Sequence, residues 1–211
     1  MGYQSKVFHY DDCRLSMSLG NDKLGNIANF NLPPTNNPEY LGTCSQTCEQ
    51  CYALRFFLQY TNTRNAYMGN AMFLKKHMRV AKIFLRDYIQ KREFPMFRIH
   101  CSGEFFSREY ITFWIDIVEQ CKKTQFLAYS KELDILELNI SKYIPNFSVM
   151  ASIMPDSTTK YIDKVTNLEN PIYFTDYSKP PFPHFECKGT CETCKTCFYA
   201  KTKTVVFNYM H

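Results

Sequence analysis

Three cysteines near residue 50 have a spacing that suits metal chemistry. Cys44, Cys48 and Cys51 form the pattern C-x3-C-x2-C. A structural zinc site is closed by four protein ligands, whereas in a [4Fe–4S] cluster three cysteines leave one iron free for a small molecule. The same spacing fits one face of a helix, but the intervening residues are all polar and extend no apolar stripe. We therefore predict that this loop binds an iron–sulfur cluster.

A second cysteine group near the C-terminus offers a complete ligand set. Its four members follow the spacing C-x3-C-x2-C-x2-C: Cys187, Cys191, Cys194 and Cys197. This order is the reverse of the bacterial ferredoxin run, which favours an auxiliary [4Fe–4S] cluster. Zinc is the alternative, although zinc sites more often separate two close pairs by a longer loop. We predict a metal centre in either case.

Three further cysteines lie outside these groups. Cys121 falls on the apolar face of a predicted helix and is expected in the core. Cys13 or Cys101 could supply a fourth ligand to the first loop. In that case no iron would remain open, and the site could not bind a small molecule at the metal.

The bulk composition restricts the class of protein. The chain has 211 residues, 45% of them hydrophobic, and a net charge of +5, which is too modest to argue for nucleic acid by itself. The first residues contain no apolar signal segment, and no apolar run is long enough to span a bilayer. We therefore expect a cytoplasmic protein without membrane contact. Ten cysteines in that compartment point to metal rather than to disulfides.

The elements that would position these cysteines alternate between strands and helices. Residues 1–43 look irregular, and residues 178–186 form a proline-rich connector to the cysteine-rich appendix of residues 178–211. Between them, apolar patterns predict strands over 94–101, 125–130, 147–154 and 171–177. Helices are predicted over 70–92, 110–121, 133–143 and 157–165, with Ser107 as an N-cap. This order predicts an α/β fold, with residues 44–177 forming a small, partial (β/α) barrel-like parallel sheet.

The first loop resembles the cysteine signature of radical S-adenosylmethionine (SAM) enzymes, C-x3-C-x-aromatic-C. Gln50 stands at the aromatic position here, and Tyr52 follows the last cysteine. In that family the second strand ends in a Gly-Gly-Glu-like turn that holds the SAM amino group. Ser102, Gly103 and Glu104 occupy the corresponding place. The resemblance implies that these residues bind SAM.

Other polar residues follow the later predicted strands. At the ends of two of these strands, Lys131 could contact a carboxylate or phosphate, and Ser152 a ribose hydroxyl. Ser130 precedes Lys131 at the same strand end. Sites in parallel α/β folds lie at the carboxyl ends of strands, which is why these residues are cofactor-binding candidates.

The order of segments resembles the phage gene product 88 family. The matching pieces are "LSMSLGNDKLGNIANFNLPP", "TCSQTCEQCYA", "FRIHCSGEFFSREYITFW", "FLAYSK" and the terminal cysteine group. The resemblance implies a radical-SAM-like loop on a small α/β scaffold, encoded by a phage or mobile element and acting in the cytoplasm of a bacterial host.

Three functions follow as hypotheses. The first is a radical SAM enzyme of unidentified substrate, served by an electron donor of the flavodoxin or ferredoxin type, with the hard chemistry supplied by the cofactor. The second is a non-enzymatic [4Fe–4S] protein for electron transfer or redox sensing, which would require a fully ligated first cluster. The third is a zinc-containing nucleic-acid module, in which tyrosines and basic residues would bind single strands.

Overall fold

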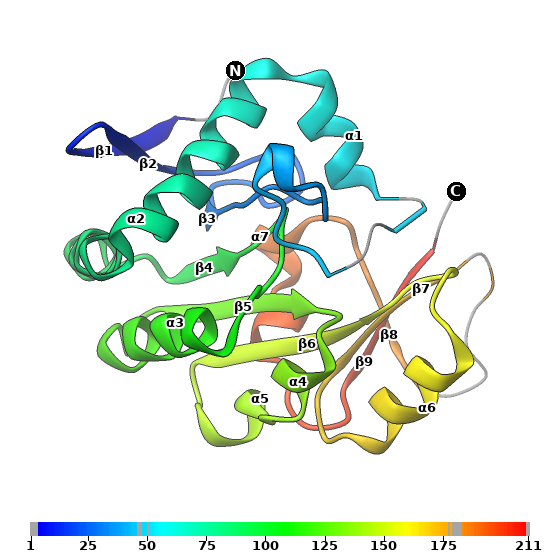
Figure 1. Cartoon of the computed structure of the whole chain (residues 1–211). Coiled ribbons are helices and arrows are strands. Elements are labelled where there is room, and N and C mark those ends of the chain that lie inside the picture. The colour runs from blue at the N-terminus through cyan, green and yellow to red at the C-terminus, as the bar shows by residue number, and fades with distance from the viewer. Residues whose placement is uncertain (1–3, 46–47, 50, 177, 179–182, 210–211) are drawn as a thin grey trace.

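One mixed sheet runs through the computed structural model of the chain, with helices packed along it (Figure 1). The structure describes residues 4–45, 48–49, 51–176, 178 and 183–209. The nine described strands are β1 (Ser5–Tyr10), β2 (Cys13–Ser18), β3 (Ala28–Phe30), β4 (Met96–Ile99), β5 (Gln125–Ser130), β6 (Phe147–Ile153), β7 (Ile172–Asp176), β8 (Phe185–Glu186) and β9 (Val205–Tyr209). Their order in the sheet is β1-β2-β3-β4-β5-β6-β7-β9-β8.

Six neighbouring strands, from β3 through β7 to β9, pair in parallel, and β8 continues this direction beside β9. Only β1, β2 and β3 pair with one another in antiparallel fashion. The prediction of an α/β fold with a mostly parallel sheet is therefore confirmed. Parallel neighbours need crossover segments between them, and each of the five crossovers contains at least one helix.

The helices and 3-10 turns lie mainly in those crossovers. Their bounds are η1 (Pro38–Tyr40), α1 (Tyr52–Gln59), α2 (Thr61–Arg92), α3 (Arg108–Gln120), α4 (Leu133–Leu136), α5 (Ile140–Tyr143), α6 (Thr159–Asn167), α7 (Cys191–Cys194) and η2 (Thr196–Tyr199). Figure 1 shows α3 to α6 along one face of the sheet and the C-terminal segment with α7 behind the strands. Ser107 caps α3 as predicted, because its Oγ accepts a hydrogen bond from the Tyr110 N–H.

The two faces of the sheet carry different cores, since successive strand residues point to opposite sides. Phe97, Phe126 and Phe147 belong to the large core beneath the helices. Their neighbours Met96 and Leu127 belong to a smaller core on the other face, which the C-terminal segment covers. The C-terminal segment, with the short helices α7 and η2, therefore covers the second face of the sheet.

Two expectations about the ends of the chain are wrong. Residues 1–43 are not irregular, because they contain β1, β2 and β3. In β2, Cys13, Leu15 and Met17 are buried and alternate with more polar residues. This alternation is the pattern of a strand, but six residues are too few to make it clear in the sequence. The C-terminal region is not a separate appendix either, because β9 inserts into the sheet between β7 and β8.

The remaining elements lie close to their predicted positions. The helix predicted from residue 70 begins nine residues earlier, as α2, and α1 precedes it. A kink at His77, whose backbone is not helical, interrupts α2. The helix predicted over 133–143 is two short helices, α4 and α5. Residues 179–182 of the proline-rich connector lie outside the described residues, and its last two residues form β8. In the described part of the chain, no helix has both the length and the apolarity that a bilayer crossing requires.

Candidate functional site

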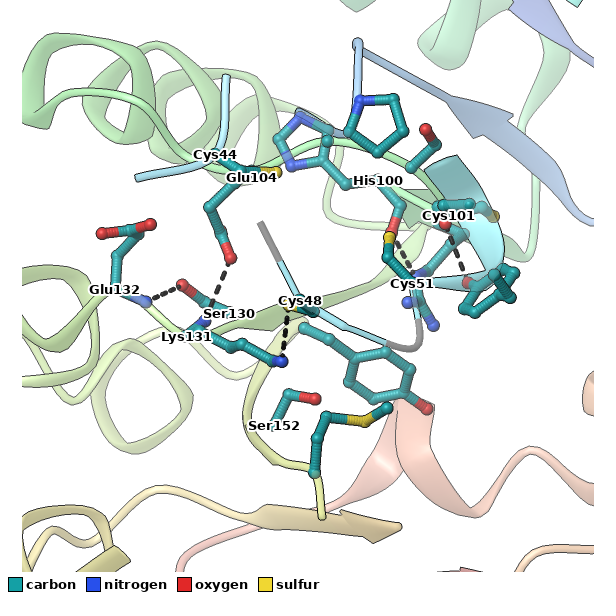
Figure 2. A pocket seen from close by; sticks show the side chains of 18 residues that line it. Cys44, Cys48, Cys51, His100, Cys101, Glu104, Ser130, Lys131, Glu132 and Ser152 are labelled. Atoms are coloured by element: carbon teal, nitrogen blue, oxygen red, sulfur yellow. Dashed lines mark hydrogen bonds between the residues drawn. The ribbon is translucent and has the colours of Figure 1, made fainter. Parts of the chain in front are cut away.

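One pocket brings together the first cysteine group and every predicted cofactor-binding residue (Figure 2). Its walls include three thiols, from Cys44, Cys48 and Cys51. The other predicted residues on its walls are Ser102, Gly103, Glu104, Ser130, Lys131 and Ser152. The sequence predicted these residues from separate strand ends, and the sheet places them around a common space.

The parallel sheet explains this convergence. The carboxyl ends of β4, β5 and β6 lie at one edge of the sheet, because these strands pair in parallel. The cysteine loop reaches the same edge, since it follows β3, which pairs in parallel with β4. Side chains far apart in the sequence are thereby held by adjacent strands.

The turn after β4 is fixed by the segment that follows β3. The Asn31 Oδ1 accepts hydrogen bonds from the N–H groups of Cys101 (2.8 Å) and Ser102 (3.2 Å). The Ser102 Oγ donates to the Leu32 carbonyl at 2.9 Å. Gly103 has a φ of 91°, and a Cβ there would lie 2.6 Å from the Leu32 Cβ. This position therefore requires glycine.

Glu104 is a buried carboxyl with two backbone donors. Its Oε1 accepts from the Phe105 N–H at 2.8 Å, and its Oε2 from the Lys131 N–H at 3.0 Å (Figure 2). Burial is the main cause that raises the pKa of Glu104 to about 7, while the two N–H donors oppose it. The Glu104 N–H in turn donates to the Thr43 hydroxyl, next to the cysteine loop. The carboxyl is held rigidly at the pocket wall.

The thiols of the first group have distinct partners. The Lys131 Nζ donates to the Cys48 Sγ at 2.9 Å (Figure 2). The Cys51 Sγ accepts from the Leu54 N–H at 3.4 Å and so caps α1. Burial raises the pKa of Cys51, and burial followed by the charge of Glu104 raises that of Cys44. The metal-free thiols of Cys44 and Cys51 stay protonated near neutral pH, so metal binding there would release protons.

The two candidates for a fourth ligand lie in different places. Cys101 lines the same pocket as the first group, and the Tyr52 hydroxyl donates to its carbonyl at 2.8 Å. Cys13 does not line that pocket. It begins β2, where its Sγ and ligand atoms of Asp12 and His77 lie within 4.8 Å of one another. Of the two, only Cys101 is positioned near the loop.

Two other sequence expectations concern single residues. Cys121 is buried at the end of α3, as predicted for a core residue. Gln50, the departure from the aromatic position of the signature, lies outside the described residues. Tyr52, the aromatic residue that follows Cys51, lines the pocket.

The second cysteine group lies on the face of the sheet that the C-terminal segment covers. All four of its cysteines line a second, small pocket together with Tyr129 and Tyr173. The Tyr173 hydroxyl donates to the Cys187 Sγ at 3.6 Å, and Tyr129 hydrogen-bonds to Cys197. Burial raises the pKa of Cys197 to about 11. Tyrosine rings thus lie beside these thiols, and Lys23 and Lys195 also line their pocket.

The spacing of the sulfur atoms bears on the kind of metal. A single zinc ion with Zn–S bonds of about 2.3 Å holds its sulfurs roughly 3.8 Å apart. Among the described residues, which include all ten cysteines, neither cysteine group places three sulfurs within 4.8 Å of one another. A cluster spreads its thiolates over several irons and so accommodates wider spacing.

Sequence reasoning missed two charged residues of the pocket, Arg98 and Glu132. Arg98 lines the wall with the cysteines although it lies inside β4, whose other residues are apolar. A charged residue within a short apolar strand was the available signal. The Arg98 side chain lies on the same face of the sheet as Met96, because residues two apart in a strand point to the same side.

Comparisons with known proteins find one family model and a phage protein. A family model described as Gene product 88 matches residues 13–177. The "Gene 88 protein" of Mycobacterium phage D29 is 30% identical over 74 residues, which are 35% of this chain and 31% of that protein. The chain thus spans about a third of the length of this curated relative. No solved structure matches the sequence. Because the family model covers most of the chain, including the cysteine loop and the strand ends around the pocket, the protein belongs to the gene product 88 family.

Proposed function

We propose that this protein is an iron–sulfur protein of radical SAM type. One observation carries the proposal: three thiols of one loop and the Ser-Gly-Glu turn share a pocket at the carboxyl edge of the parallel sheet. The six parallel strands support it further, since the cysteine loop follows the first of them and the turn follows the second. We also propose that these strands form the partial (β/α) barrel predicted from the sequence.

The donor set fits a cluster with an open position. Cys44, Cys48 and Cys51 would hold three irons of a [4Fe–4S] cluster, because three thiolates leave the fourth iron open. The Lys131 ammonium beside the Cys48 sulfur would balance part of the negative charge of the thiolates. Bound there, the cluster would supply the electron that cleaves SAM.

The chain's own residues would bind and orient SAM. The Glu104 carboxylate can accept hydrogen bonds from the amino group of SAM, because its two backbone donors leave further lone pairs. Gly103 supplies the φ of 91° that this turn needs beside Leu32, and so helps to hold Glu104 at the pocket wall. Ser152, on β6 across the pocket, is the candidate for a ribose hydroxyl.

The second cysteine group would take an auxiliary [4Fe–4S] cluster, with zinc as the alternative. Four thiols are a full ligand set, so this centre would have no iron left open. Electrons would come from a donor of the flavodoxin or ferredoxin type. We place this activity in the cytoplasm of a bacterial host, where reducing conditions keep cysteines as thiols.

Metal analysis with SAM titration tests the proposal. Protein purified without oxygen and reconstituted should contain about eight irons per chain, as two four-iron clusters require. Cys44→Ala should lose about four irons and all SAM binding, measured by calorimetry. Cys13→Ala is the matched control, because its cysteine lies outside the pocket and should leave both quantities unchanged. A Cys44→Ala protein with full iron content and normal SAM affinity would refute the proposal.

The position of Cys101 favours a second candidate, a non-enzymatic redox protein. Cys101 lines the pocket with the three loop cysteines and could close the cluster as a fourth ligand. In that case Cys101→Ala should abolish the signal of the first cluster, measured by electron paramagnetic resonance. If Cys101→Ala retains that signal and its SAM-induced change, this second candidate is excluded.

A further inference from the structure

Arg98 carries a buried positive charge that has no carboxylate partner. The residue is only 5% exposed, and an arginine stays ionised in proteins. Its Nε donates to the His100 carbonyl at 3.1 Å, and its guanidinium carbon lies 3.8 Å from the centre of the Tyr129 ring. Within the described residues, it forms no salt bridge and its two terminal nitrogens have no hydrogen-bond partner. A buried unpaired charge is costly, so its presence indicates a missing anion.

The surroundings of Arg98 show where that anion would lie. Arg98 lines the pocket of the first cysteine group and also an adjoining cavity of about 460 Å³, within the size range of small-molecule sites. Cys101 lines both of these spaces, and Cys191 of the second group also lines the cavity. The cavity therefore lies between the two cysteine groups.

Five aromatic residues contribute to the remaining walls of this cavity. Its ring residues are Tyr52, Phe56, Tyr60, Tyr67 and Tyr129. Rings of this kind pack against flat or apolar groups, and phenol hydroxyls add hydrogen bonds at their edges. Lys23 adds a second cation, and the exposed Asp22 is the carboxylate among the lining residues.

The geometry of a guanidinium defines the anion. Two terminal nitrogens of one arginine form paired hydrogen bonds with a planar carboxylate or with a phosphate. The stacking on Tyr129 holds the guanidinium plane in place before a ligand arrives, which reduces the ordering cost of binding. Arg98 is thus preorganised for an oxoanion.

We propose that Arg98 binds the oxoanion group, carboxylate or phosphate, of a small substrate whose flat or apolar body occupies the aromatic cavity between the two cysteine groups. The word substrate rests on the radical SAM function proposed above. The oxoanion site itself rests on Arg98 and the cavity, so the two statements can fail separately.

Small aromatic probes test the site. Phenyl phosphate and phenylacetate carry the two oxoanions, and phenylacetamide is their uncharged counterpart. Calorimetry on the reconstituted full chain without SAM should detect binding of at least one oxoanion. Arg98→Met should weaken that binding at least tenfold, in line with the loss of a charged hydrogen-bonding partner, and leave phenylacetamide unchanged. The tighter of the two oxoanions identifies the class of the natural ligand.

Controls separate binding from folding. Arg86→Met is the matched arginine control, because Arg86 pairs with Asp87 on α2, away from the cavity. Arg98→Lys should bind with intermediate affinity, and it replaces Arg98→Met if the latter fails to fold. The wild-type chain gives a test that needs no variant: 10 mM oxoanion probe should raise its melting temperature more than phenylacetamide does.

Two results would overturn the inference. One is wild-type protein that neither binds nor is stabilised by either oxoanion. The other is equal oxoanion affinity in wild type and Arg98→Met, which would leave Arg98 as a counter-charge for thiolates alone. SAM titration of the same samples keeps the two proposals apart. Oxoanion binding without SAM binding would retain the site and reject the radical function, and the reverse result would do the opposite.

Discussion

The first cysteine group lies among charged and hydrogen-bonding groups at the sheet edge, whereas the second lies against tyrosine rings on a sheet face. Near the first, Lys131 contacts a sulfur and Glu104 presents a carboxyl to the same pocket. Near the second, the partners are the hydroxyls of Tyr129 and Tyr173. The first group thus has the means to hold a polar ligand beside a metal, while the second has only the means to hold the metal. Thiol count agrees, with three in one group and four in the other.

The largest expected effect comes from removing the second group alone. Cys187→Ser combined with Cys194→Ser should lose about four irons per chain, because a four-thiolate cluster cannot form. SAM affinity should remain within about twofold of wild type, since neither residue lines the first pocket. Iron analysis and calorimetry measure both quantities. Loss of SAM binding in this variant would show that the two groups are not separate sites.

A pair of glycines provides the next test. Gly103→Ala should lower the melting temperature by several degrees and abolish SAM binding, because an added Cβ would clash with Leu32 at a φ of 91°. Gly189→Ala is the matched control in the second region. Its φ of 75° is also strained for alanine, but no atom lies within 4 Å of the added Cβ. Thermal melting should therefore show a smaller loss for Gly189→Ala, with SAM binding intact. Equal losses would mean that backbone strain, rather than contact with Leu32, governs both positions.

The sequence predicted the strand ends but not the residue between the two groups. Parallel strands with continuous apolar runs, such as β5 and β6, are legible in sequence, and their carboxyl ends must meet at one edge. Ser130, Lys131 and Ser152, which were predicted from these strand ends, all line the pocket, and their role in cofactor binding stays a prediction. Arg98 was missed because its role depends on which face of β4 lines the pockets rather than the large core. Long-range packing decides which face that is.

The N- and C-terminal strands were missed for a related reason. β1 is largely exposed, so its sequence has little apolar pattern. β9 follows a cysteine-rich segment, and its five residues are recognisable as a strand only from their pairing with β7 and β8. The choice between Cys13 and Cys101 likewise depends on the sheet, because the pairing of β3 with β4 brings Cys101 next to the loop. Local pattern cannot supply such pairings.

A pH titration tests the charged character of the first region. The pKa of Glu104 is raised to about 7, so its carboxyl is mostly protonated at pH 6 and mostly ionised at pH 8. An ammonium group binds the ionised form, and SAM affinity should therefore rise several-fold from pH 6 to pH 8. Glu104→Gln should bind SAM about tenfold more weakly and lose this rise. Calorimetry on iron-loaded protein measures the affinity, over the range in which the visible absorption stays constant. A wild-type affinity that falls with pH would contradict the assigned role of Glu104.

The smallest expected effect concerns Lys131, the cation that contacts a thiol of the first group among the described residues. Lys131→Met removes a positive charge 2.9 Å from the Cys48 sulfur, so the reduced, more negative form of the cluster loses stabilisation. The reduction potential of this one-electron couple should become more negative by on the order of 65 mV, the equivalent of one charged hydrogen bond of about 1.5 kcal/mol. Lys131→Arg keeps the charge and should shift the potential less. In the second region, Tyr173→Phe removes only a neutral donor 3.6 Å from Cys187 and should change that cluster's potential least of all. If Tyr173→Phe shifts its cluster more than Lys131→Met shifts the first, the electrostatic contrast between the two regions is wrong, because the charged partner would then matter less than the neutral one.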